Sequence, residues 1–132
     1  MVVLIVDDEK VVAESMAAIF RLSGHEPTFA TSASAALVLA LEIRPQLLIT
    51  DVVMPGETGI ELAVKVLAQV PTCKVLLMSG QAETSNLLED AEQQGHHFEI
   101  LAKPVWPPDL LARARALVGE DDSNTEAATA SS

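Results

Sequence analysis

The chain has 132 residues, enough for one domain with its own hydrophobic core. Apolar residues make up 49% and charged residues 20%, which is the balance of an ordinary globular protein. The net charge of −11 repels nucleic-acid phosphates, so we do not expect this chain to bind DNA or RNA directly. No stretch approaches the roughly 20 apolar residues of a membrane span, and no signal peptide is recognisable, so a cytoplasmic location is expected.

Short apolar runs alternate with helical patterns along the whole chain. The runs typical of buried strands are Val2–Val6, Glu26–Ala30, Gln46–Thr50, Lys74–Met78 and Phe98–Ala102. Apolar spacing and capping signals predict helices over residues 9–23, 33–43, 59–69, 85–94 and 109–118. Strands that alternate with helices imply a parallel sheet with helices on both faces. The sequence therefore predicts a doubly wound α/β fold of the (βα)5 type.

The polarity of the strands predicts their order in the sheet. The first, third and fourth runs are almost wholly apolar, as interior parallel strands are. The second run contains Glu26 and Pro27 and the fifth contains Glu99, so both are expected at the edges. The flavodoxin-like order 2-1-3-4-5 satisfies these conditions. This domain is expected to span residues 1–118, and the small, polar, acidic tail over residues 119–132 is expected to be disordered.

Polar and charged side chains end four of the predicted strands. In chain order they are Asp7 and Asp8, Asp51, Ser79 and Lys103. In an open α/β sheet, ligands bind beyond the carboxyl ends of the strands where the strand order reverses, and this point lies between the first and third strands. The three carboxylates are therefore expected to meet there. Two ionised carboxylates about 5 Å apart repel by about 3 kcal/mol at an effective dielectric of about 20. This repulsion favours a bound hard cation such as Mg²⁺.

Each of these residues is also compatible with a simpler role. Asp8 alone fits an N-cap of the first helix, Asp51 and Ser79 fit turn positions, and Lys103 fits a solvated strand end. Taken together, however, a carboxylate nucleophile, a metal, a lysine and a hydroxyl are the parts of a phosphoryl-transfer site. The joint pattern therefore favours phosphoryl chemistry at Asp51.

The segments that carry these residues resemble the receiver domain of two-component response regulators. They are Val-Asp7-Asp8-Glu9, Asp51-Val-Val-Met-Pro55-Gly, Met-Ser79-Gly80 and Ala-Lys103-Pro104, and the resemblance covers residues 1–118.

The resemblance implies a role for each site residue. Asp51 would accept a phosphoryl group from a sensor histidine kinase or a histidine phosphotransfer protein. Mg²⁺ would be held by Asp8, Asp51 and the main-chain carbonyl of Val53, with Asp7 acting through water. Lys103 would pair with a phosphoryl oxygen, Ser79 would hydrogen-bond the phosphoryl group, and the Lys103-Pro104 bond would be a candidate for the cis form.

One position departs from the family pattern. Receivers typically carry an aromatic residue three positions before the lysine, where this chain has Ile100. Phe98 lies two residues earlier and faces the same side of the strand. We therefore expect the signal to be muted, or to run through the loop over residues 80–86 and the helix over residues 85–94. The surface that changes is expected around the fourth helix, fifth strand and fifth helix, which would contact an unknown downstream protein.

Two other functions remain open at this point. One is an aspartyl-nucleophile phosphatase, but such enzymes resemble one another in a second Asp two residues after the nucleophile, where this chain has Val53. We therefore do not expect an enzyme. The other is a receiver-like binding module that is not phosphorylated, against which the intact acidic set, Ser79 and Lys103 argue. The oligomeric state is left open, a homodimer included.

Two further residues carry structural expectations. The single cysteine, Cys73, excludes an internal disulfide and predicts a buried thiol. Trp106 is expected to pack at the start of the last helix and not to form part of a partner site.

Overall fold

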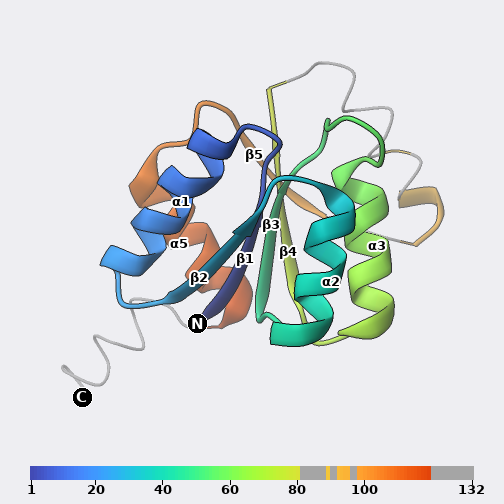
Figure 1. The fold of residues 1–132 in the computed structure, drawn as a ribbon, viewed down its shortest axis with the longest axis horizontal. Helices are drawn as coiled ribbons and strands as arrows, with labels where there is room; N and C mark the ends of the chain where they lie inside the picture. Colours follow the sequence, from blue (N-terminus) through green and yellow to red (C-terminus); the bar gives the residue numbers. More distant parts are fainter. Residues whose placement is uncertain (81–88, 90–91, 96–97, 120–132) are drawn as a thin grey trace.

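Five parallel strands form one sheet in the part of the chain that this computed structural model describes, which is residues 1–80, 89, 92–95 and 98–119 (Figure 1). The strands are β1 (Val2–Val6), β2 (Glu26–Ala30), β3 (Leu47–Asp51), β4 (Lys74–Ser79) and β5 (Glu99–Ala102). Their order is β2-β1-β3-β4-β5, and every neighbouring pair is parallel. The predicted α/β class and strand order are confirmed.

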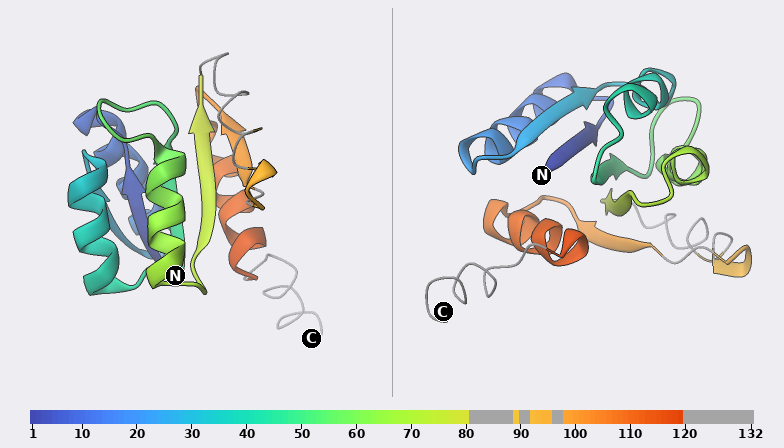
Figure 2. Two further views of the ribbon diagram at one scale, coloured as in Figure 1. Left: turned by 90° about the vertical axis from the view of Figure 1, so that its right-hand side faces the viewer. Right: turned by 90° about the horizontal axis from the view of Figure 1, so that it is seen from below.

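Helices cover both faces of this sheet. They are α1 (Lys10–Leu22), α2 (Ala33–Ile43), α3 (Gly59–Gln69) and α5 (Pro107–Val118). Figure 2 shows α1 and α5 on one face and α2 and α3 on the other. Most of the helix predicted over residues 85–94 lies outside the described residues, as does the tail from residue 120 onward.

The core is divided by the sheet, because successive side chains of a strand point to opposite faces. In β1, Val3 and Ile5 pack with α1 and α5, whereas Leu4 and Val6 pack with α2 and α3. All four of these side chains are fully buried. The two-sided burial explains why the run is continuously apolar and does not alternate.

Side-chain caps begin two of the helices, as the sequence predicts. The Ser32 hydroxyl accepts a hydrogen bond from the Ala35 N–H at 3.2 Å at the start of α2. Thr58 and Glu61 form a full capping box at the start of α3, with bonds of 3.1 and 2.8 Å. The first helix differs: its N-cap is Glu9, which makes no side-chain cap, so Asp8 does not cap α1.

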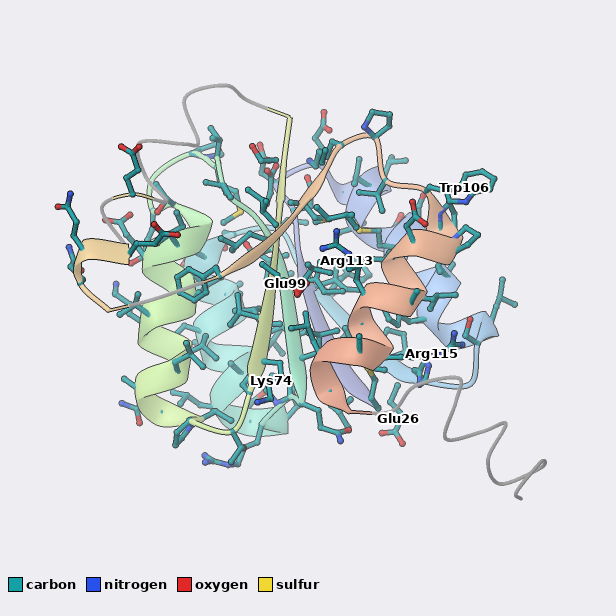
Figure 3. The ribbon with its side chains drawn as sticks, turned by 180° about the vertical axis from the view of Figure 1, so that it is seen from behind. Glu26, Lys74, Glu99, Trp106, Arg113 and Arg115 are labelled. Atoms are coloured by element: carbon teal, nitrogen blue, oxygen red, sulfur yellow. The ribbon has the colours of Figure 1, made fainter. Side chains whose placement is uncertain are left out.

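The expectation for Cys73 is confirmed, whereas the expectation for Trp106 is wrong. Cys73 is buried, and burial raises the pKa of its thiol to about 11. Trp106 does not pack into the core, since it is 64% exposed. It is the N-cap of α5, and Figure 3 shows its side chain pointing away from the helix. Its neighbours Val105 and Leu110 pack against the core cluster instead.

None of the helices in the described part of the chain is long and apolar enough to cross a membrane.

Candidate functional site

The backbone ladder continues past the strand ends and places the site residues. The Asp7 N–H donates to the Ala30 carbonyl at 3.2 Å, which holds the residue after β1 against the end of β2. The Lys103 N–H donates to the Ser79 carbonyl at 2.9 Å, which holds the residue after β5 against the end of β4. Asp51 is itself the last residue of β3. The polar residues that end the strands therefore lie at one edge of the sheet.

Three carboxylates meet at this edge. One oxygen from each of Asp7, Asp8 and Asp51 lies within 4.8 Å of the other two. Asp7 is fully buried and Asp51 is 9% exposed, whereas Asp8 is exposed. The structure thus brings together the three acidic residues that the topology placed in one crevice. Repulsion among three close carboxylates, two of them buried, raises carboxyl pKa values or is relieved by a cation.

Lys103 supplies part of that compensation. Its Nζ donates to Asp7 Oδ2 and to Asp51 Oδ2, both at 3.0 Å. Burial acts against the charged form of Lys103, but the hydrogen bonds to Asp7 and Asp51 and their negative charges outweigh it and raise the pKa of the ammonium group. Lys103 therefore remains protonated at neutral pH, and its ammonium group links Asp7, after β1, to Asp51, at the end of β3.

Asp51 is in a less favourable environment. Burial raises the pKa of its carboxyl group, and the negative charges of Asp7 and Asp8 add to this effect. The hydrogen bond and positive charge of Lys103 oppose the effect but do not cancel it. The site therefore has spare negative charge at neutral pH, which a second cation would neutralise.

A pocket of about 490 Å³ opens over Asp51, and Asp8, Glu9, Val53 and Lys103 are among its lining residues. Its acidic groups offer oxygen atoms only, the donor type that hard divalent cations such as Mg²⁺ prefer. The donor set and the spacing of the carboxylates therefore fit a Mg²⁺ site.

Asp7 is held by two hydrogen bonds. Its Oδ2 accepts from Lys103, and its Oδ1 accepts from the Glu9 N–H at 2.9 Å. Each oxygen of this buried carboxylate thus already has a partner, which distinguishes Asp7 from the exposed Asp8.

Of the remaining predicted residues, Ser79 and Pro104 lie at the same edge, whereas Ile100 lies within β5 and Phe98 just before it. Ser79 ends β4 opposite Ala102 and is half-buried, and it is not among the residues that line the pocket. The Lys103-Pro104 peptide is cis, as expected. Ile100 and Phe98 pack against the same cluster between the sheet and the α2/α3 layer, so the predicted shared face is observed.

Two residues beside Asp51 were not singled out by the sequence. Thr50 is fully buried and its hydroxyl donates to the Asp51 carbonyl at 3.0 Å. Gly59, the first residue of α3, packs against the same carbonyl. A polar residue at the end of the apolar run Leu47–Ile49, directly before Asp51, was the available signal for Thr50. For Gly59 there was no such signal, because its contact with Asp51 depends on the fold.

A family model described as the response regulator receiver domain matches residues 3–115. Among curated proteins, the DNA-binding response regulator MtrA of Mycobacterium tuberculosis is 27% identical over 120 residues, which cover 91% of this chain and 51% of the relative. The chain spans about half the length of the curated relatives it matches.

Solved structures share the fold. A CheY-like response regulator receiver domain protein from Methanospirillum hungatei has a TM-score of 0.78 and 26% identity, with 93% of this chain and 97% of that chain covered. The receiver domain of the hybrid histidine kinase CckA has a TM-score of 0.74 and 28% identity, with 89% and 99% covered.

Proposed function

Because the chain belongs to the family of response regulator receiver domains, we propose that Asp51 accepts a phosphoryl group from a phosphohistidine. Receiver domains of two-component systems interact with histidine kinases. The donor would therefore be a sensor histidine kinase or a histidine phosphotransfer protein. The supporting observation is that Lys103 holds Asp51 Oδ2 at 3.0 Å while Asp51 also lines the pocket.

The chain supplies the nucleophile and one cation for the transfer. An Asp51 oxygen attacks phosphorus, so an O–P bond forms while the P–N bond to the donor imidazole breaks. The leaving imidazole takes the electron pair and later a proton. Lys103 favours the ionised carboxylate before attack, and its ammonium group lies beside the phosphoryl oxygens afterwards. Ser79 would donate its hydroxyl to the phosphoryl group.

Mg²⁺ would bind among the acidic residues. Asp8, Asp51 and the main-chain carbonyl of Val53 would ligate it, since all three residues line the pocket. Asp7 would act through water, because both of its oxygens already accept hydrogen bonds. The bound ion would neutralise charge that develops on the phosphoryl oxygens.

The product would be a covalent signal and not a turnover intermediate. Val53 lies two residues after Asp51 and has no group that could exchange a proton with water or with a leaving group. Aspartyl-nucleophile phosphatases resemble one another in an Asp at this position, which exchanges that proton. We therefore propose an acceptor module that is not an enzyme.

The donor would dock beside the pocket. An apolar groove of about 510 Å³ adjoins it and shares Glu9 and Lys103 with it. The groove lies between α1 and the segment after β5, and its apolar lining includes Val11, Val12, Ile19, Pro104 and Val105. A protein that must bring a phosphohistidine to Asp51 would cover this groove while it does so. An amphipathic helix fits such a surface.

Phosphorylation would also change a surface that a downstream protein reads. The expected elements are the helix over residues 85–94, β5 and α5, where an added dianionic group would bias the conformation of nearby loops. The downstream protein is unidentified.

The proposal is tested with a small phosphodonor. Wild-type protein is incubated with acetyl phosphate and Mg²⁺, and intact mass is measured. We expect wild type to gain one phosphoryl group and Asp51→Asn to gain none. Asp109→Asn, which changes an acidic residue at the start of α5, is the control and should be modified like wild type.

Two outcomes would favour the alternatives. Steady release of phosphate from a phosphomonoester, lost in Asp51→Asn, would indicate a phosphatase. Failure of wild type to bind beryllofluoride with Mg²⁺ would indicate a binding module that is not phosphorylated.

A further inference from the structure

The main-chain carbonyl of Asp51 is enclosed by two residues outside the proposed chemistry. The Thr50 hydroxyl donates to this carbonyl oxygen at 3.0 Å from a fully buried position. A Cβ placed on Gly59 would lie 2.1 Å from the same oxygen and 3.0 Å from Thr50 Oγ1. The first separation is far shorter than van der Waals contact, and the second is at the limit of it. Only glycine therefore fits at residue 59 without movement of the backbone.

The next peptide is held as well. The Gly59 N–H donates to the Val52 carbonyl at 2.8 Å, and the Val52 N–H donates to the Met78 carbonyl at 3.0 Å. The first residue of α3 therefore contacts two successive carbonyls at the end of β3. The Asp51 carbonyl is therefore held by the Thr50 hydroxyl and by close packing of Gly59. The Val52 peptide is held by the Gly59 N–H and by the Met78 carbonyl of β4.

We propose that Thr50 and Gly59 are positioning residues that set the direction of the Asp51–Val52 peptide and thereby the geometry of the phosphoacceptor site. This inference rests on the proposed function. The Asp51 carboxylate and the Val53 carbonyl are two of the groups expected to hold Mg²⁺, and they lie on either side of the clamped peptide. A rotation of that peptide would displace one relative to the other. Misplacement of reacting groups by about 1 Å can cost about 100-fold in rate.

A purely structural role would have different consequences. A buried hydroxyl that satisfied only the core, or a glycine that served only close packing of helix on strand, would affect the free energy of unfolding. It would leave the affinity of the folded protein for Mg²⁺ unchanged. The Mg²⁺ dissociation constant therefore separates positioning from packing.

The test uses isothermal titration of the unphosphorylated protein with Mg²⁺, together with urea denaturation. Thr50→Val keeps the shape of the side chain and removes the hydroxyl, whereas Thr50→Ser keeps the hydroxyl. We expect Thr50→Val to weaken Mg²⁺ binding about tenfold, Gly59→Ala to weaken it at least as much, and Thr50→Ser to stay within about twofold of wild type. Ala63→Gly weakens α3 at a buried position one turn further on and should lower the denaturation midpoint without changing Mg²⁺ affinity.

A Thr50→Val protein with wild-type Mg²⁺ affinity would overturn the inference, and so would wild-type protein that binds no Mg²⁺. If Gly59→Ala does not fold, the two Thr50 variants decide. If wild type binds Mg²⁺ but takes no phosphoryl group from acetyl phosphate, the proposed function fails, and the Mg²⁺ titrations still decide whether Thr50 and Gly59 position the site.

Discussion

Folding makes the charged form of the Asp51 carboxyl less favourable than it is in the unfolded chain. Its pKa is raised above the ordinary value of 3.8, chiefly by burial, and Lys103 only partly offsets this. Between the unfolded and folded pKa values the folded state binds more protons than the unfolded state. The free energy of unfolding therefore falls as pH rises through this window, which begins near the ordinary carboxyl pKa and extends upward. The Asp51 carboxylate, the proposed phosphoacceptor, therefore destabilises the folded state at neutral pH.

The direction of this pKa shift predicts how removal of the Asp51 charge changes the free energy of unfolding. We expect Asp51→Asn to raise the free energy of unfolding of the Mg²⁺-free protein at neutral pH by about 1 kcal/mol. The gain should shrink at about pH 4, because the wild-type carboxyl is then increasingly protonated. Urea denaturation at both pH values measures it. Asp109→Asn, which removes a favourable charge from the first turn of α5, should give no such gain. A less stable Asp51→Asn protein at neutral pH would contradict the prediction.

Contacts between site residues that follow from the sheet topology could be predicted from the sequence, whereas close contacts that depend on loop paths could not. Asp7, Asp51 and Lys103 could be predicted to meet because the carboxyl ends of parallel strands share one edge. The contact of Gly59 with Asp51 required the path of the β3–α3 loop. The exposure of Trp106 could not be predicted, since an indole before a helix is compatible with a packed or an exposed position.

The capped helices allow a comparison of two N-termini on the same face of the sheet. At α3, Thr58 and Glu61 satisfy each other's backbone N–H groups, whereas at α2 Ser32 makes one side-chain cap to the backbone. An N-cap substitution to alanine usually costs about 0.5–2 kcal/mol. Loss of the N-cap side chain should therefore lower the free energy of unfolding more at α3 than at α2.

We expect Thr58→Ala to lower the free energy of unfolding by about 1–2 kcal/mol and Ser32→Ala by about 0.5–1 kcal/mol. Chemical denaturation of both variants gives the comparison. Glu61→Gln is the matched control, because glutamine keeps the reciprocal hydrogen bond to the Thr58 N–H, and it should lose less than Thr58→Ala. Equal losses at Thr58 and Ser32 would show that the reciprocal bond contributes little.

The elements themselves were largely predictable, and their ends less so. Continuous apolar runs, together with Glu26, Pro27 and Glu99, gave the strands and their order. The last helix begins at Pro107, two residues before the predicted start, because proline is well suited to the first helical positions, where its missing N–H has no partner to lose. Strands β3 and β4 extend one residue further than predicted, to Asp51 and Ser79, because the sheet pairing continues past the apolar run.

At the scale of the whole molecule, the acidic pocket at the carboxyl edge of the sheet adjoins an apolar groove between α1 and the segment after β5. Val11 is 75% exposed and lines the groove that adjoins the pocket, and the exposed Trp106 follows directly after Val105 of its lining. Exposed tryptophans often carry much of the binding energy of an interface, and an exposed aliphatic side chain nearby adds apolar area that is buried with them. Under the proposed function, a small phosphodonor would need only the pocket, whereas a protein donor would also need the groove.

This difference predicts two separable reactions. We expect Val11→Ser and Trp106→Ser to slow phosphoryl transfer from a purified, phosphorylated histidine phosphotransfer domain by about tenfold each, the effect of losing about 1.4 kcal/mol at an interface. Phosphorylation by acetyl phosphate should stay at the wild-type rate, because neither residue lines the pocket. Leu22→Ser is the matched control: Leu22 is 89% exposed on the same helix but is not among the groove residues, so both reactions should be unchanged. Equal slowing by all three variants, or slowing with acetyl phosphate, would contradict a docking role for the groove.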